Sequence, residues 1–237
     1  MKLSVVIPVY NEVATLPQVL DRVALALPDV DKEIIIVDDG SQDGTRDWLR
    51  VTFDPLAKHQ NIPVNVILHD RNRGKGAALR TGFSHVTGDV IVIQDADLEY
   101  NPKDWQALWD LIAEDWADVV YGSRFYGRPH RVLYFHHLLG NQVISFLVNL
   151  LCNTTLTDVE VCTKMFRREV VAAMPLVCND FGFEVEFTIK MARAGRWRIY
   201  EVGIAYYGRT FAEGKKINWR DGLRALGYIL RFGLWPQ

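Results

Sequence analysis

The chain has 237 residues, of which 49% are hydrophobic and 24% charged, and its formal net charge is −2 at pH 7. This length suits one large domain, or a domain with an appendage, and the near-neutral charge excludes a general nucleic-acid-binding protein. The three cysteines form no CxxC pair, which argues against a disulfide scaffold or a structural zinc site and favours a reducing compartment. The N-terminal residues lack the pattern of a secretory signal peptide.

Strand-like and helix-like segments alternate through the first 121 residues. The run EIIIVD at 33–38 is unbroken in Ile and Val, which is typical of a strand buried on both faces of a parallel sheet. The predicted strands are 3–7, 33–38, 64–68, 89–94 and 117–121, and the predicted helices are 15–26, 46–53, 76–86 and 103–113. This alternation predicts an α/β fold with a mostly parallel, twisted sheet flanked by helices, in which ligands bind at the carboxyl ends of the strands.

The pattern changes after residue 121, because residues 132–151 contain no Asp, Glu, Lys or Arg. Four polar residues recur there at intervals of four, which on a helix gives one polar stripe along an apolar cylinder: His137, Asn141, Ser145 and Asn149. Two interpretations stay open, a buried core helix or a helix in a membrane interface. A full span is disfavoured, because its polar side chains would be costly in hydrocarbon. We therefore expect no transmembrane domain.

Positive charge gathers in the same region. The stretch 119–157 has no acidic residue but contains Arg124, Arg128 and Arg131, which points to an anionic partner. A helix at 183–194, a strand at 197–204, and a basic loop and helix complete the chain.

Three acids follow the fourth predicted strand at every second position: Asp95, Asp97 and Glu99. Their side chains would point to one side of an extended segment, where like charges repel unless a cation lies among them. Carboxylate oxygens suit a hard divalent ion, which would also neutralise a bound diphosphate. Asp38 and Asp39 close the second strand, one to cap the turn and the other to bind a base or a ribose. The GKG at 74–76 is read either as a phosphate-binding turn or as a plain helix start.

The motifs SVVIPVYNE, VDDGSQDGT, NRGKGAALRTGF and DADLEYNP, in this order, resemble the family 2 glycosyltransferases with the GT-A fold. The later GSRF, TDVEVCTKMFRREV, FGFEVEFTIKMARAG and YYGRTFAEGKKI resemble the dolichyl-phosphate mannose synthase branch and its bacterial polyprenyl-phosphate relatives. The resemblance covers essentially the whole chain. It implies one catalytic domain over 1–237, with a nucleotide-sugar-binding half (1–121) and an acceptor-binding half (122–237). The second half would carry a membrane-facing helix and a C-terminal interfacial or amphipathic helical region.

The resemblance also implies roles for individual residues. The nucleotide sugar would be bound by Pro8, Tyr10, Glu12, Val37, Asp39, Lys75, Asp95, Ala96, Asp97, Arg124, Arg209 and Lys215. Mg²⁺ or Mn²⁺ would be held by Asp95 and Asp97 with Glu99, although relatives often carry Gln at this last position. The catalytic residues would be Asp95, Asp97, Arg124 and Asp158. For Asp158, which lies where other family 2 enzymes place a base, two roles stay open: orienting a cation such as Lys164, or structural capping.

The reaction that the resemblance implies is inverting, metal-dependent transfer of a hexose from a nucleotide sugar, of the GDP-mannose or UDP-glucose type, to a dolichyl or undecaprenyl phosphate. A phosphate oxygen is already anionic near neutral pH, so a strong general base is not required. A lipid acceptor suits the acid-free segment beside an apolar helix, and places the protein peripherally on the cytoplasmic face of a membrane. The alternatives are a family 2 transferase acting on a non-lipid sugar or protein acceptor, and a non-catalytic nucleotide-sugar binder.

Overall fold

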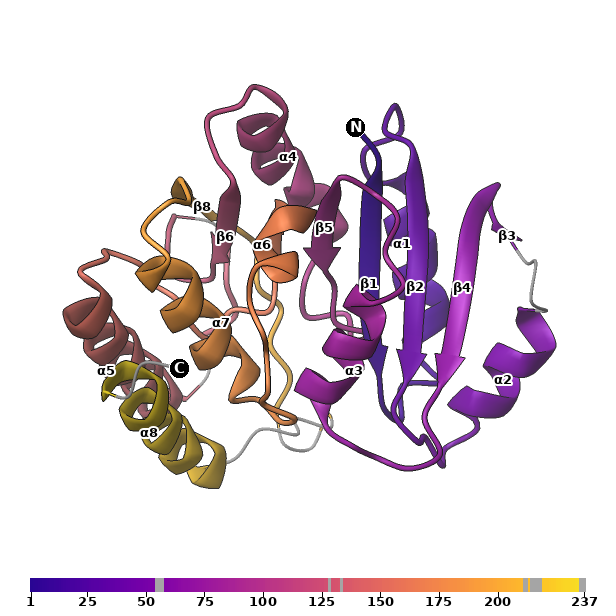
Figure 1. Ribbon diagram of the computed structural model, residues 1–237. Helices are drawn as coiled ribbons and strands as arrows, with labels where there is room; N and C mark the ends of the chain where they lie inside the picture. The colour runs from indigo at the N-terminus through magenta and orange to yellow at the C-terminus, as the bar shows by residue number, and fades with distance from the viewer. Residues whose placement is uncertain (54–57, 128, 133, 211–212, 214–218, 235–237) are drawn as a thin grey trace.

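The computed structural model describes residues 1–53, 58–127, 129–132, 134–210, 213 and 219–234. Arg128 and Lys215 therefore lie outside the described residues. One sheet runs through the molecule in the order β3-β4-β2-β1-β5-β7-β6-β8 (Figure 1). Its strands are β1 (Leu3–Val9), β2 (Lys32–Asp38), β3 (Lys58–His59), β4 (Ile62–Leu68), β5 (Val90–Ile93), β6 (Val119–Ser123), β7 (Lys164–Arg167) and β8 (Ile199–Gly203).

Helices cover the sheet on both faces, with α3 in front of it and α1 behind it in Figure 1. They are α1 (Leu16–Leu25), α2 (Thr45–Thr52), α3 (Lys75–Phe83), α4 (Trp105–Ala113), α5 (Phe135–Cys152), α6 (Arg168–Ala172), α7 (Phe183–Arg193) and α8 (Trp219–Leu234), with a 3₁₀ turn η1 (Pro102–Asp104) before α4. Strand β2 shows why helices are needed on both faces of the sheet. Its residues Ile34 and Ile36 belong to one apolar cluster, whereas Ile35 and Val37 pack with Ala78 of α3 in another. Both faces of this strand are buried, as predicted from its unbroken apolar run.

Strand direction places the functional side chains at one edge of the sheet. Strand β1 pairs in parallel with both β2 and β5. Strand β6 points the same way as β5, because each pairs antiparallel with β7, which lies between them. The residues that follow these four strands, Tyr10, Asp39, Asp95 and Arg124, therefore meet at the carboxyl edge.

Every strand and helix predicted within residues 1–121 is present, with bounds that differ by a few residues. The mostly parallel α/β sheet is confirmed. Three short elements were not predicted: β3, β7 and α6. Strand β7 has four residues and enters the sheet antiparallel between β5 and β6, so local alternation of strands and helices contains no signal for it.

Helix α5 has its polar stripe toward the protein and its apolar residues toward solvent. Ser145 accepts a hydrogen bond from the Val159 amide at 3.1 Å, and the Asn149 side chain donates to the Leu156 carbonyl at 2.8 Å. The opposite face is exposed, and it consists of Phe135, Leu139, Val143, Phe146 and Leu150. By length and composition α5 is the one helix of the described residues that could cross a membrane. A core helix of a soluble protein is mostly buried, whereas only 17% of α5 is buried in the protein. The core-helix interpretation is therefore wrong.

Glu33 joins the amino ends of three strands. Its carboxylate accepts hydrogen bonds from Ser4 at the start of β1, from the Lys2 ammonium, and from both the amide and hydroxyl of Thr87 before β5. Burial raises the pKa of Glu33, but the hydrogen bonds from Lys2, Ser4 and Thr87 outweigh it and lower the pKa to about 2. The ionised form is thus strongly favoured in the folded state.

We expect Glu33→Gln to lower the free energy of unfolding by about 1–3 kcal/mol at pH 7, because a hydrogen-bonded charge is lost. The folded-state pKa lies below the unfolded value of about 4.3, so this stability is full above pH 5 and disappears as the pH falls toward 2. Urea unfolding at pH 7 and pH 3 measures both effects, with Asp47→Asn, an exposed charge, as control. An equal loss of stability at both pH values would contradict the pKa assignment.

Candidate active site

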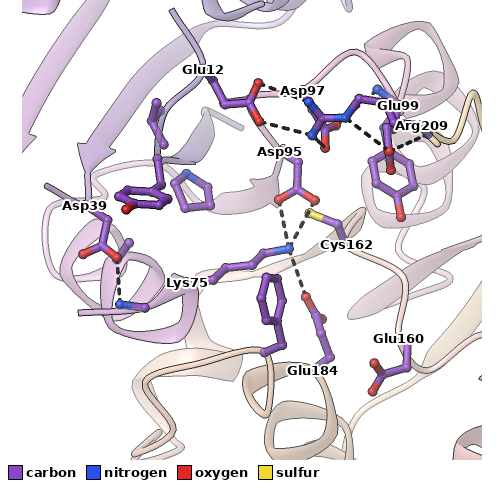
Figure 2. Close-up of a pocket in the computed structure, with 18 of the residues that line it drawn as sticks. Glu12, Asp39, Lys75, Asp95, Asp97, Glu99, Glu160, Cys162, Glu184 and Arg209 are labelled. Carbon is purple, nitrogen blue, oxygen red and sulfur yellow. Dashed lines mark hydrogen bonds and ion pairs between the residues drawn. The ribbon is translucent and has the colours of Figure 1, made fainter. Parts of the chain in front are cut away.

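A cavity of about 400 Å³ opens at the carboxyl edge of the sheet (Figure 2). Most of the predicted nucleotide-sugar and metal residues line it: Pro8, Tyr10, Glu12, Asp39, Lys75, Asp95, Ala96, Asp97, Glu99, Arg124 and Arg209. They come from the ends of β1, β2, β5 and β6, from the start of α3, and from a loop after β8. Residues that are far apart in the sequence are thus assembled into one site.

Asp39 organises the loop at one side of the cavity. Its carboxylate accepts hydrogen bonds from the amides of Arg73 and Gly74, at 2.9 and 2.7 Å, and lies 2.7 Å from Nδ1 of His69. The neighbouring Asp38 is fully buried and forms an ion pair with Arg46 at 3.0 Å. A carboxylate has about four acceptor positions, so Asp39 keeps capacity for a ribose hydroxyl while it holds its own loop.

The two glycines of the GKG turn are required by close backbone packing. A Cβ atom on Gly74 would lie 2.3 Å from the Asn179 carbonyl oxygen, and one on Gly76 would lie 2.4 Å from that of Cys178. The Ala77 amide donates to the Asn179 carbonyl at 3.0 Å. These contacts support a plain helix start, in which Gly74 and the side chain of Lys75 line the cavity.

Lys75 begins a chain of alternating charges across the cavity floor (Figure 2). Its ammonium lies 2.9 Å from Asp95 and 3.4 Å from Glu184, which also pairs with Lys164. Burial would raise the pKa of Asp95, but the charge of Lys75 and the hydrogen bonds from Cys162 and Lys75 together outweigh this, so the net shift is downward. Asp95 is therefore held ionised and fixed in position.

Arg209 gathers three carboxylates on the other side of Asp95. Its guanidinium lies 3.1 Å from Glu12, 2.9 Å from Asp97 and 3.4 Å from Glu99. Tyr206 donates to Glu99 at 2.9 Å. Burial and the charges of Asp95 and Glu99 raise the pKa of Asp97 to about 7, despite the guanidinium. This corner therefore holds more negative charge than Arg209 alone compensates.

The donor set fits a divalent cation, although the described side chains are not arranged around one. Among them, no group of three His, Cys, Asp or Glu residues has metal-site spacing as it stands. Asp95 and Asp97 contact Lys75 and Arg209 instead. Carboxylate oxygens are the ligands that Mg²⁺ and Mn²⁺ prefer, and three carboxylates share the one guanidinium of Arg209, so such an ion would neutralise charge that Arg209 leaves uncompensated.

Asp158 forms a two-pronged ion pair with Arg124. Its oxygens accept hydrogen bonds from Nε and from one terminal nitrogen of the guanidinium, both at 2.7 Å, and one also accepts from the Arg124 amide. The cation that Asp158 orients is Arg124 and not Lys164, which pairs with Glu184. Asp158 itself is fully buried and is not among the residues that line the cavity.

One residue predicted to bind the nucleotide sugar, Val37, does not line the described cavity. Val37 is buried against Ala78, beneath the site. Lys215 lies outside the described residues. The lining residues that were not predicted include His137 and Asn141 of α5, Glu160, Cys162 and Glu184. For two of these a signal existed, because DVEVCTK at 158–164 places a polar residue at every second position.

Comparisons with known proteins agree with this geometry. Residues 4–174 match the profile of Glycosyl transferase family 2. The chain is 31% identical over 216 residues to an undecaprenyl-phosphate 4-deoxy-4-formamido-L-arabinose transferase of Sodalis glossinidius (strain morsitans). The match spans 90% of this chain and 62% of that relative, so the chain corresponds to only part of the relative's length.

Solved structures show the same fold. A glucosyl-3-phosphoglycerate synthase of Mycobacterium tuberculosis, crystallised with Mn²⁺, UDP and glucosyl-3-phosphoglycerate, superposes with a TM-score of 0.70 at 19% identity, covering 100% of this chain and 81% of that one. A second structure of that enzyme, with Mg²⁺ and UDP, gives a TM-score of 0.68 at 19% identity, covering 100% and 80%. The likeness confirms the GT-A fold, and together with the profile match over most of the chain it establishes that this protein belongs to the family 2 glycosyltransferases.

Proposed function

We propose that the protein transfers a hexose from a nucleotide sugar to a polyprenyl phosphate at a membrane surface, with Mg²⁺ or Mn²⁺ as cofactor. The observation that carries the proposal is the position of α5. One face of this helix lines the catalytic cavity through His137 and Asn141, and the opposite face is an exposed apolar strip. The phosphate head of a polyprenyl phosphate suits the polar face of α5 at the cavity, and its hydrocarbon tail suits the exposed apolar face at a membrane.

The charge of the cavity supports a metal-bound donor. The described lining contains seven carboxyl side chains against the three cations Lys75, Arg124 and Arg209. A diphosphate would be repelled by this excess of negative charge, so its binding requires a divalent ion. The ion would be held by Asp95 and Asp97 and would stabilise the charge that develops on the leaving diphosphate. The relatives solved with UDP and Mn²⁺ or Mg²⁺ are consistent with this assignment.

The protein's own residues then have distinct tasks. Asp39 and its loop would bind the nucleoside, and Lys75 would hold Asp95 ionised. Arg209 would turn from its three carboxylates toward the diphosphate, and Arg124 would attract the acceptor phosphate. That phosphate oxygen attacks the anomeric carbon in line and the diphosphate leaves, which inverts the configuration. No side chain has to remove a proton, because the nucleophile is already anionic near pH 7.

The membrane side of the proposal rests on two helices that pack together, α5 and α8. Helix α8 exposes Leu223, Leu230 and Leu234, which add to the apolar strip of α5. A peripheral position on the cytoplasmic face suits these surfaces. It also suits the three free thiols Cys152, Cys162 and Cys178.

A transfer assay tests the reaction. Radiolabelled UDP-glucose and GDP-mannose are incubated with undecaprenyl phosphate or dolichyl phosphate and Mn²⁺, and label extracted into butanol is counted. We expect lipid-linked label with one donor, and its loss in excess EDTA. Transfer to 3-phosphoglycerate but to neither lipid would instead support the soluble-acceptor alternative, and binding without any transfer would support a non-catalytic binder.

The membrane surface makes its own prediction. Phe146 and Leu150 are 63% and 69% exposed. Replacing both with Ser should weaken liposome binding at least about tenfold, because each apolar side chain buried in lipid contributes roughly 1.5–3 kcal/mol. The melting temperature should stay within about 2 °C of the wild type, since exposed positions contribute little to folding. Vesicle co-sedimentation and thermal unfolding measure the two quantities.

The matched control is Val148→Ser on the same helix. Val148 is fully buried, so this change should lower the free energy of unfolding by about 2–5 kcal/mol, as truncation of core side chains does. Unchanged vesicle binding by the Phe146/Leu150 variant, or a stability loss equal to that of Val148→Ser, would remove the membrane assignment.

A further inference from the structure

Among the described residues, one carboxylate of the cavity forms no hydrogen bond or ion pair. Of the seven acidic side chains in the described lining, six are engaged by cations or polar groups of the protein: Glu12, Asp39, Asp95, Asp97, Glu99 and Glu184. The seventh is Glu160. Its Oε1 atom is buried and forms no hydrogen bond within the described part of the chain. A buried carboxylate oxygen without a partner is costly, and such an atom is satisfied when a ligand supplies a donor.

The backbone around Glu160 is fixed on both sides. Asp158, two residues earlier, is locked to Arg124, and Lys164, four residues later, pairs with Glu184. Between them the Cys162 thiol lies beside Lys75 and Asp95 (Figure 2). Glu160 therefore projects into the cavity from a rigid segment, which is the arrangement expected of a residue that recognises a ligand.

The position of Glu160 identifies which part of a ligand it meets. Figure 2 shows Asp39 and Glu160 at opposite sides of the site, with Lys75 and Asp95 between them. Under the proposed function, on which this step rests, the nucleoside lies toward Asp39 and the diphosphate lies at Asp95 and Asp97. The sugar then extends beyond the diphosphate, toward Glu160.

We propose that Glu160 binds the transferred sugar, accepting hydrogen bonds from its hydroxyl groups, and so sets which sugar nucleotide the enzyme uses. Sugar hydroxyls donate hydrogen bonds, whereas the acceptor phosphate carries negative charge and would be repelled by a carboxylate. A buried acceptor on a rigid segment discriminates strongly, because a sugar without a hydroxyl at that position leaves the acceptor unsatisfied.

The surroundings of Glu160 agree with this role. Burial, followed by the charge of Glu184, raises the pKa of Glu160 to about 7. A hydroxyl that donates to the carboxylate would favour its ionised form and lower this pKa. Sugar binding and ionisation of Glu160 are thus linked.

The experiment compares nucleotide sugars with their own diphosphates. Isothermal titration calorimetry with Mn²⁺ at pH 8 measures the Kd of UDP, UDP-glucose, GDP and GDP-mannose for the wild type, Glu160→Gln and Glu160→Ala. For the sugar nucleotide that the wild type binds, we expect each variant to raise the Kd about 10-fold to 100-fold, as loss of a charged hydrogen bond does. The Kd of the corresponding diphosphate should change less than twofold, because it lacks the sugar.

Glu169→Gln is the matched control, since it removes an exposed carboxylate from α6 outside the cavity and should change neither Kd. Equal weakening of diphosphate and sugar nucleotide would show that Glu160 supports the fold or a cation, and would overturn the proposal. An unchanged Kd for the sugar nucleotide in a variant whose kcat falls would make Glu160 a base, and would also overturn it.

The outcomes separate this inference from the proposed function. If the wild type forms the lipid-linked product and both Glu160 variants bind the donor normally, only the assignment of Glu160 fails. If the wild type binds neither sugar nucleotide and forms no lipid-linked product, both proposals fail together.

Discussion

Asp97→Asn should reduce kcat for sugar transfer by at least about 10³-fold, because a metal ligand contributes several kcal/mol and each 1.4 kcal/mol is a factor of ten. The substitution keeps the shape of the side chain and removes its charge. Titration of the variant with Mn²⁺ in the presence of nucleoside diphosphate should also show a weaker affinity for the metal than the wild type has. This second measurement does not depend on which donor or acceptor the enzyme uses.

The fold should survive the change. The pKa of Asp97 is raised above its ordinary value by burial and by its acidic neighbours, so its ionised form destabilises the folded protein once the pH passes about 4. Asn carries no such charge, and we expect the melting temperature at pH 8 without metal to stay equal or to rise. Full turnover by the variant, or full wild-type turnover in excess EDTA, would remove the metal assignment, and Asp47→Asn controls for loss of a remote charge.

The fold was predictable where one strand could be identified from its own residues. The runs VVI at 5–7, IIIV at 34–37 and VIVI at 90–93 are unbroken and apolar, and the structure buries each in the middle of the sheet. Parallel pairing then forces their carboxyl ends to one edge. This is why Tyr10, Asp39 and Asp95, which span about 85 residues of the chain, could be assigned to one site from the sequence.

The partners of individual side chains were not predictable in the same way. The prediction offered Lys164, a near neighbour in sequence, as an example of a cation that Asp158 orients, whereas the structure pairs Asp158 with Arg124. The reason is β7, whose insertion between β5 and β6 carries the 158–163 segment past the end of β6. A four-residue strand that joins a sheet from a distance has no periodicity of its own, so contacts that depend on it are hidden in the sequence.

Helix α5 shows an intermediate case. The spacing of its polar residues predicted a stripe, and the stripe exists. Whether that stripe faced water or protein depended on which elements pack against α5, and the sequence of one helix does not specify them. The structure directs Ser145 and Asn149 to the loop that precedes β7, so the apolar face is left outside. Contacts made outside the helix therefore exclude the core-helix interpretation, whereas the membrane interface stays a proposal.

Asp158→Ala should lower the free energy of unfolding by about 3–5 kcal/mol, which is the usual cost of leaving a buried charge without its partner. The pair is well enclosed, since the side chain of Arg124 is 11% exposed and that of Asp158 is fully buried. For a protein of this size the melting temperature should fall by roughly 6–20 °C. Transfer should also be lost, because an unanchored Arg124 can no longer hold a phosphate in a fixed position.

A double variant distinguishes this supporting role from that of a general base. Replacing Arg124 with Met and Asp158 with Leu removes both charges, and buried ion pairs exchanged for apolar residues often lose little stability. We expect the double variant to recover most of the melting temperature while transfer stays absent. If Asp158 were a base instead, the single variant would lose turnover without losing stability, and the low-pH limb of the kcat profile would disappear with it. The two hydrogen bonds of 2.7 Å from the guanidinium leave that carboxylate fully engaged, and a phosphate nucleophile does not need it to take a proton.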